Sequence, residues 1–177
     1  MNNIVLIGMM GCGKTSVGQV VSQYLKLPFI DTDTMIEDRT KMTIPHIFEQ
    51  YGESYFRSVE SEIARQAATC TNTVIATGGG IVKNPQNMAL LGTSGFVVYL
   101  RCSPRQLYER TAEDHNRPLL NTAEKQEERL TKLEELLANR EPLYTQYSDF
   151  IIDAGEATVG ELSNVILERV KDEHSGN

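Results

Sequence analysis

A short segment near the start of the chain combines glycines, a lysine and hydroxyl side chains: residues 8–16 read GMMGCGKTS. Gly8, Gly13, Lys14 and Thr15 fit the spacing G-x-x-x-x-G-K-[ST], in which successive backbone N–H groups surround the β-phosphate of a nucleotide. In this pattern the lysine spans the β- and γ-phosphates, and the hydroxyl ligates Mg²⁺. The sequence therefore predicts a P-loop. The residues expected to bind the nucleotide are Gly11, Cys12, Gly13, Lys14, Thr15 and Ser16.

A P-loop needs a buried strand before it and a helix after it, and the flanking sequence predicts both. The apolar run NIVLI precedes the loop, and valines follow it at helical spacing. Further along, short β-branched runs alternate with segments of helical period, which is typical of a parallel sheet covered by helices. The expected later strands lie in LPFID, in NTVIATGGG, which ends in three glycines, in GFVVYLRC and in DFIIDA, and a two-part helical region over 43–69 breaks at Gly52. We therefore expect an α/β fold.

The composition limits what else the protein could be. With 177 residues the chain fits one domain with one core. Its 17 basic and 24 acidic residues give a net charge of −7, which argues against a nucleic-acid surface. No apolar stretch approaches the roughly 20 residues that span a bilayer, and three cysteines without CxxC spacing predict neither a disulfide framework nor a zinc site. We expect a soluble cytoplasmic protein with no signal peptide and no nucleic-acid or membrane partner.

A second set of polar residues suggests an acceptor site for a phosphoryl group. It consists of DTD at 31–33, Arg57, GGG at 78–80 and several later arginines. Glycines at the end of a parallel strand let the backbone approach a ligand closely. A GTPase would share the P-loop, but the guanine-reading N-K-x-D motif is absent from the sequence. A protein that only binds nucleotide would not need this second pocket, so the pattern favours an enzyme.

Several motifs in one order resemble the shikimate kinase family. They are GMMGCGKTS, DTD, IPHIFEQYGESYFRSVE, TGGG, RPLL and NREPLY, and they run nearly from end to end of the chain. The resemblance implies one three-layer P-loop kinase domain over 1–177, with a five-stranded parallel sheet, a helical substrate-binding subdomain at about 31–62 and a mobile lid at about 110–124. It also implies a monomeric or weakly associating enzyme that transfers the γ-phosphoryl of ATP, with Mg²⁺, to the 3-hydroxyl of shikimate.

The same resemblance implies which residues bind the acceptor. Arg57 and Arg140 resemble carboxylate-binding arginines, and a planar guanidinium suits a carboxylate. Asp33 resembles the catalytic residue that orients or deprotonates the attacking hydroxyl, and it could also, or instead, cap a helix that begins near Thr34. Gly79 resembles a backbone donor to shikimate.

Other matching positions concern ATP. Lys14 and the lid residue Arg117 resemble catalytic residues that stabilise the charge of the transferred phosphoryl group. Asp31 resembles an acidic residue near Mg²⁺ that contacts the ion through water, while the Thr15 hydroxyl ligates it. Arg110 resembles a residue that covers the adenine ring.

The sequence also leaves alternatives. After the last expected strand the chain reads DAGEAT, where many relatives place a basic or polar adenine contact, so the adenine contacts remain open. A different small P-loop kinase, such as a gluconate kinase, is the alternative within enzymes. A nucleotide-dependent binding module is the alternative outside them.

Overall fold

The computed structural model describes residues 2–111 and 126–175. Within these ranges five strands form one parallel sheet in the order β2-β3-β1-β4-β5. The strands are β1 (Asn3–Ile7), β2 (Phe29–Asp31), β3 (Val74–Ala76), β4 (Gly95–Arg101) and β5 (Phe150–Asp153). This arrangement confirms the expected α/β fold and the five-stranded parallel sheet.

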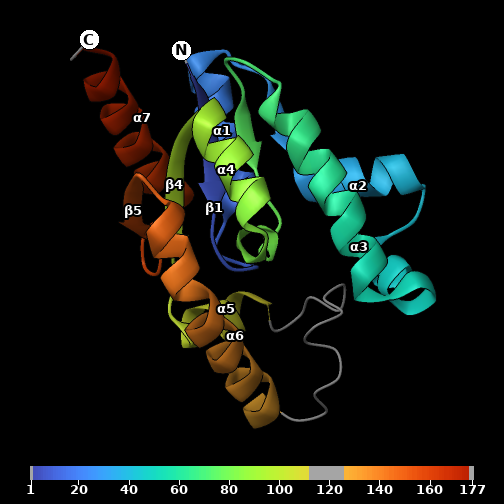
Figure 1. Ribbon diagram of the computed structural model, residues 1–177. Coiled ribbons are helices and arrows are strands. Elements are labelled where there is room, and N and C mark those ends of the chain that lie inside the picture. Colours follow the sequence, from blue (N-terminus) through green and yellow to red (C-terminus); the bar gives the residue numbers. More distant parts are fainter. Residues whose placement is uncertain (1, 112–125, 176–177) are drawn as a thin grey trace.

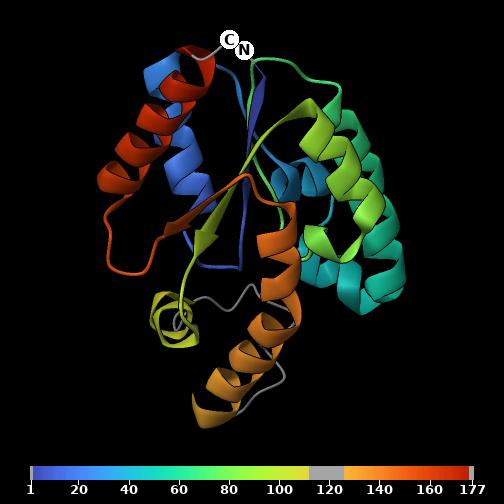
Figure 2. The same ribbon diagram turned by 60° about the vertical axis from the view of Figure 1, so that its left-hand side comes forward.

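Helices cover both faces of the sheet (Figure 1). They are α1 (Lys14–Leu25), α2 (Thr32–Thr40), α3 (Ile44–Ala68), α4 (Pro85–Ser94), α5 (Pro104–Thr111), α6 (Gln126–Tyr147) and α7 (Val159–Ser175), with a short 3₁₀ helix, η1 (Ile81–Lys83). Figure 2 shows α1 beside α7 on one face and α3 beside α4 on the other. Among the helices that the structure describes, none combines the length and the apolar character needed to cross a membrane.

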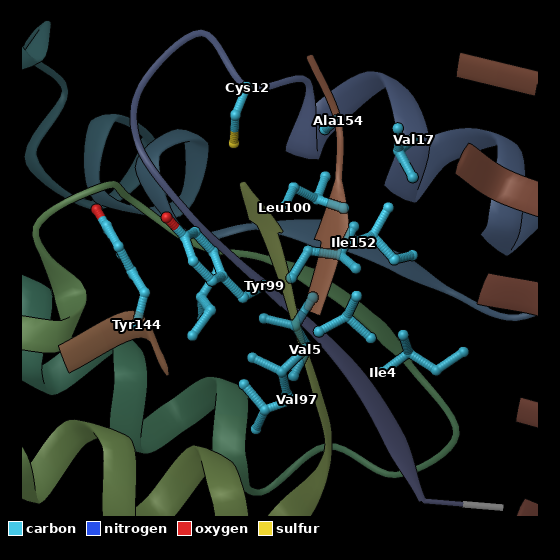
Figure 3. Packing of buried hydrophobic residues seen from close by; sticks show 14 of the residues in the cluster. Ile4, Val5, Cys12, Val17, Val97, Tyr99, Leu100, Tyr144, Ile152 and Ala154 are labelled. Carbon is cyan, nitrogen blue, oxygen red and sulfur yellow. The ribbon is translucent and has the colours of Figure 1, made fainter. Parts of the chain in front are cut away.

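The core lies around the central strands, because all five residues of β1 are buried between β3 and β4. A strand buried on both faces is typically an uninterrupted apolar run, which explains why residues 4–7 do not alternate with polar residues. Figure 3 shows β1 and β4 side chains packed together near two buried tyrosines, Tyr99 and Tyr144. The two rings stack with their centroids 4.9 Å apart.

The α2 and α3 helices share a small hydrophobic cluster of their own. Its buried members are Ile36, Ile47, Phe56, Val59 and Ile63. Gly52 interrupts α3 with φ 76° and ψ 175°, a conformation that favours glycine, and this confirms the expected break in the helical region. The bounds of this unit as a substrate-binding subdomain stay a prediction.

The helix α4 was not expected from the apolar pattern. Its boundary signals are nevertheless present, since the Asn84 side chain accepts a hydrogen bond from the backbone of Gln86 (2.9 Å) and Pro85 occupies the first turn. Only Met88 and Leu91 among its apolar residues are fully buried. The helix is short and its buried side is narrow, so its periodicity is weak.

We expect Gly18→Ala to destabilise the protein. A Cβ at Gly18, in the middle of α1, would lie 2.6 Å from Cε2 of Phe29 and 3.2 Å from Cδ1 of Leu6. The free energy of unfolding should fall by about 1–2 kcal/mol in urea denaturation, because small-to-large changes in a packed core force neighbours to move. As a control, Gly92→Ala in α4 meets nothing within 4 Å. Gly92→Ala should raise the free energy of unfolding by about 0.5 kcal/mol. A stabilising effect of Gly18→Ala would contradict the packing of α1 against Phe29 and Leu6.

Candidate active site

The P-loop lies between β1 and α1 and holds its lysine inside the loop. Gly13 caps α1 with φ 97° and ψ 13°, a left-handed conformation. The Lys14 ammonium donates to the backbone oxygens of Gly8 (2.9 Å) and Met9 (2.8 Å). Lys14 is only 8% exposed, and these two hydrogen bonds fix the position of its ammonium group. A buried ammonium at a helix N-terminus forms a strongly electropositive site, suited to phosphate.

Asp31 joins the P-loop to α2. Its Oδ2 accepts a hydrogen bond from the Thr15 hydroxyl (2.7 Å), and its Oδ1 accepts from the backbone N–H groups of Asp33 (3.0 Å) and Thr34 (3.5 Å). Asp31 is therefore the N-cap of α2, which begins at Thr32. The alternative reading of Asp33 as the cap of a helix beginning near Thr34 is wrong. Asp33 instead lies in the first turn of α2.

The end of β2 lies against the glycine-rich end of β3. The two strands are parallel neighbours, so the segments that follow them leave the same edge of the sheet. The Gly78 N–H donates to the Thr32 hydroxyl at 3.0 Å. A Cβ placed on Gly78 would lie 2.5 Å from Oδ1 of Asp33. The DTD motif at 31–33 and the GGG motif at 78–80 therefore form one continuous wall, which we call the acceptor wall.

Arg57 lies on α3 within a network of charged groups. Its Nη1 donates to Glu60 (2.7 Å), and its Nε and Nη2 donate to one oxygen of Glu53 (3.2 and 3.1 Å). The Lys83 ammonium donates to the same Glu53 oxygen at 3.0 Å. The guanidinium is thus oriented from two sides.

Burial controls the electrostatics of this network. Glu60 is only 2% exposed, and burial raises the pKa of its carboxyl, while the neighbouring Arg57 acts to lower it. Burial alone would lower the pKa of Arg57, but the Glu60 and Glu53 carboxylates outweigh it, so the pKa of Arg57 is raised and the guanidinium stays charged. One oxygen of Glu60 accepts from Arg57, and the other has no hydrogen-bond partner within the described part of the chain.

Arg140 and Tyr144 reach the same wall from α6. They are one helical turn apart, and both donate to the backbone oxygen of Gly79, Arg140 through Nη1 at 3.2 Å and Tyr144 through its hydroxyl at 2.5 Å. Arg140 is 4% exposed and also lies 3.9 Å from the Met9 sulfur. The C-terminal half of α6 therefore contacts both the acceptor wall and the P-loop segment.

These elements surround a cleft of about 750 Å³. Of the residues that the sequence analysis selected, those that line it are Gly11, Gly13, Lys14, Thr15, Ser16, Asp31, Asp33, Arg57, Gly79 and Arg140. Residues from five separate parts of the chain thus share one space. An anionic polyphosphate and an anionic acceptor could both be held there by local cations, although the protein as a whole is acidic.

Two of the selected residues do not line the cleft with their side chains, and a third is not described by the structure. The Cys12 thiol is fully buried in the core and does not line the cleft, so only its backbone could contact a ligand (Figure 3). Arg110 is held by the segment after β5, because its Nη2 donates to the backbone oxygens of Ala154 and Gly155, both at 2.8 Å. Arg117 lies outside the described residues.

The structure adds site residues that the sequence analysis did not select. Ile44, Pro45, Phe48 and Phe56 form an apolar side of the cleft. The rings of Phe48 and Phe56 are 4.8 Å apart. In the sequence these residues have the spacing of an ordinary amphipathic helix, and nothing distinguishes a cleft-lining face from a core face.

Comparison with known proteins gives a consistent result. The family model for shikimate kinase matches residues 10–171. The shikimate kinase of Ralstonia nicotianae is 44% identical over 170 residues, which cover 96% of this chain and 87% of that protein. The shikimate kinase of Cupriavidus pinatubonensis is 44% identical over 169 residues, covering 96% of this chain and 86% of that protein.

Solved structures agree with this assignment. A shikimate kinase from Acinetobacter baumannii in complex with shikimate superposes with a TM-score of 0.93 at 36% identity, covering 98% of this chain and 94% of that one. The shikimate kinase from Aquifex aeolicus gives 0.83 at 31% identity, with 99% of each chain covered. Because the family model and these relatives extend over nearly the whole sequence, the chain belongs to the shikimate kinase family.

Proposed function

We propose that the protein transfers the γ-phosphoryl group of ATP to the 3-hydroxyl of shikimate. The observation that carries this proposal is the shared cleft, which Lys14 and Thr15 line together with Asp33, Arg57 and Arg140. A polyphosphate on the P-loop and an acidic cyclic alcohol on the facing wall would meet within it. The A. baumannii relative, which was solved in complex with shikimate, supports the identity of the acceptor.

The acceptor end of the cleft suits a carboxylate on a ring. Three of the five N–H bonds of Arg57 donate to Glu53 and Glu60, so the guanidinium keeps donors for a ligand carboxylate. The neighbouring rings of Phe48 and Phe56, which are tilted by 39° to each other, offer an apolar surface to the carbon face of a ring. An open-chain polyol acid such as gluconate presents hydroxyls along its length and would gain less from that surface, which favours shikimate.

Asp33 is the residue we assign to the attacking hydroxyl. Its carboxylate lies beside Gly78 on the acceptor wall and lines the cleft. A carboxylate that accepts a hydrogen bond from the attacking hydroxyl orients its lone pair toward phosphorus and can take the proton as the bond forms. We assign Lys14 to the other reactant, the nucleotide, where its ammonium stabilises charge on the transferred phosphoryl group.

The phosphate end fits a nucleotide with Mg²⁺. The protein oxygens that we assign to the metal are the Thr15 hydroxyl and the Asp31 carboxylate, which lie 2.7 Å apart beside the P-loop. Mg²⁺ is suited to such a site, because it keeps several waters and binds through one or two protein oxygens plus phosphates. When bound, Mg²⁺ neutralises phosphate charge. The roles of Arg110 at the adenine and of Arg117 in a lid over 110–124 stay predictions.

We further infer that the enzyme acts as a monomer in the cytoplasm. The cations at both ends of the cleft, Lys14, Arg57 and Arg140, belong to the same chain, so the proposed reaction requires no cation from a second copy. Cys12, Cys70 and Cys102 are free thiols, which is typical of a reducing compartment. Light scattering at assay concentration would test the oligomeric state.

A coupled assay of ADP release tests the proposed function directly. The purified full chain, with ATP and Mg²⁺, should release ADP when shikimate is added, and much less with gluconate or without an acceptor. Comparable rates with gluconate would favour the alternative kinase. A lack of turnover with every acceptor would contradict the assignment as a kinase.

Asp33→Asn should lower the rate of phosphoryl transfer by orders of magnitude while leaving ATP binding intact. The amide keeps the size of the side chain but is a poor base, and general-base catalysis contributes about 10²–10⁴-fold, so kcat should fall by that order. Steady-state kinetics and ATP titration by calorimetry measure the two effects. Asp38→Asn, at an exposed position on the same helix, is the matched control and should retain normal kcat. Near-normal turnover of the Asp33 variant would refute its assigned role.

Arg57→Lys should raise the KM for shikimate roughly tenfold or more while leaving the KM for ATP unchanged, since a hydrogen bond to a charged group contributes about 1.5–3 kcal/mol. Lysine keeps a positive charge beside Glu60 and so avoids leaving a buried carboxylate unpaired. The control is Arg39→Lys, which changes an exposed pair with Glu62 away from the cleft. A rise in both KM values would indicate general damage to the fold instead.

Two substitutions at Asp31 should separate capping from metal binding. Asparagine is as good an N-cap as aspartate, so Asp31→Asn should keep the free energy of unfolding while raising the Mg²⁺ concentration needed for half-maximal activity. Asp31→Ala should show the same Mg²⁺ effect and also lose about 1 kcal/mol of stability in urea denaturation. If the asparagine variant needs no more Mg²⁺ than the wild type, Asp31 has no part in the metal site.

A further inference from the structure

One carbonyl group in the acceptor wall receives two hydrogen bonds from the same helix. The backbone oxygen of Gly79 accepts from Nη1 of Arg140 and from the hydroxyl of Tyr144. Both donors are buried, and Tyr144 is completely inaccessible to solvent. Arg140 resembles a carboxylate-binding arginine of the family. Tyr144 has no assigned part in the reaction.

The geometry of the peptide bond extends the effect of this contact to the next residue. The Gly79 carbonyl and the Gly80 N–H belong to one planar trans peptide unit and point in opposite directions, so a bond that fixes the first also fixes the second. Within the described residues, the N–H groups of Gly79 and Gly80 donate to no protein group and so are available to a ligand. Both residues line the cleft.

Gly80, at the far end of this peptide unit, also adjoins Arg57. A Cβ placed on Gly80 would lie 2.6 Å from Nη2 of Arg57. The Gly79–Gly80 peptide therefore lies between Arg140 on α6 and Arg57 on α3. Rotation of this peptide would change the spacing of the donors that face the acceptor.

We propose that Tyr144 is a positioning residue for the acceptor: its hydroxyl, together with Arg140, fixes the Gly79–Gly80 peptide and so the backbone donors beside Arg57. The inference rests on the proposed function, since the acceptor is shikimate. Burial raises the pKa of Tyr144 above its ordinary value, so the phenol keeps its proton and remains a hydrogen-bond donor.

The neighbouring tyrosine provides a matched control. Tyr99 stacks on Tyr144, is equally buried, and also has a pKa raised by burial (Figure 3). Its hydroxyl, however, has no hydrogen-bond partner among the residues that the structure describes. Removing either hydroxyl deletes one oxygen atom from the same stacked pair, but only one deletion releases the Gly79 carbonyl.

The test compares Tyr144→Phe with Tyr99→Phe in steady-state kinetics, varying shikimate and ATP separately. Loss of one neutral hydrogen bond should raise the KM for shikimate about 3- to 10-fold in Tyr144→Phe, with the KM for ATP within about twofold of wild type. Tyr99→Phe should leave both KM values within about twofold. Thermal melts of both variants show whether a change in KM follows a loss of stability.

Equal kinetics for the two phenylalanine variants would overturn the inference, and so would a parallel rise in both KM values for Tyr144→Phe. Replacement of Tyr144 by 4-aminophenylalanine keeps an N–H donor at the same place and should restore a wild-type KM for shikimate. A raised KM in this variant would count against the inference even if Tyr144→Phe fails to fold. Wild-type enzyme that does not phosphorylate shikimate would instead contradict the proposed function.

Discussion

The active site depends on a contact between two stretches of backbone that leaves little room for a side chain. A Cβ on Gly79 would lie 3.1 Å from the backbone nitrogen of Met10 and 3.4 Å from the oxygen of Gly8. This approach is possible because β1 and β3 are adjacent parallel strands whose following loops leave the same edge of the sheet. The contact determines how far the phosphate loop lies from the acceptor wall. In-line phosphoryl transfer is sensitive to that separation, because the reacting atoms must be brought close together.

Charge is organised locally in this protein. The chain has a net charge of −7, yet three cations, Lys14, Arg57 and Arg140, line the cleft. Each is oriented by protein groups: backbone oxygens hold Lys14 and Arg140, and carboxylates hold Arg57. Cations whose positions are fixed by the fold need little reorganisation when an anion binds, and such preorganised electrostatics is commonly the largest contribution to catalysis.

Local patterns in the sequence were enough to predict the strands, the P-loop and the break at Gly52. Features that depend on tertiary contacts were not accessible in the same way. The sequence suggested Asp33 as a helix cap, whereas the cap is Asp31, and its place depends on where β2 stops pairing with β3. Phe48 has the spacing of a core residue although it lines the cleft. The bond from Tyr144 to Gly79 joins residues 65 positions apart, which no local pattern records.

The lengths of the strands have a consequence for the behaviour of the protein in concentrated solution. The outermost strands, β2 and β5, have three and four residues, whereas the interior strand β4 has seven. Unpaired N–H and C=O groups at a sheet edge are templates for pairing with another chain, and short edge strands are one way in which proteins limit this hazard. The sheet therefore keeps its longest hydrogen-bonding strand away from neighbouring molecules, which protects the folded enzyme against edge-to-edge aggregation.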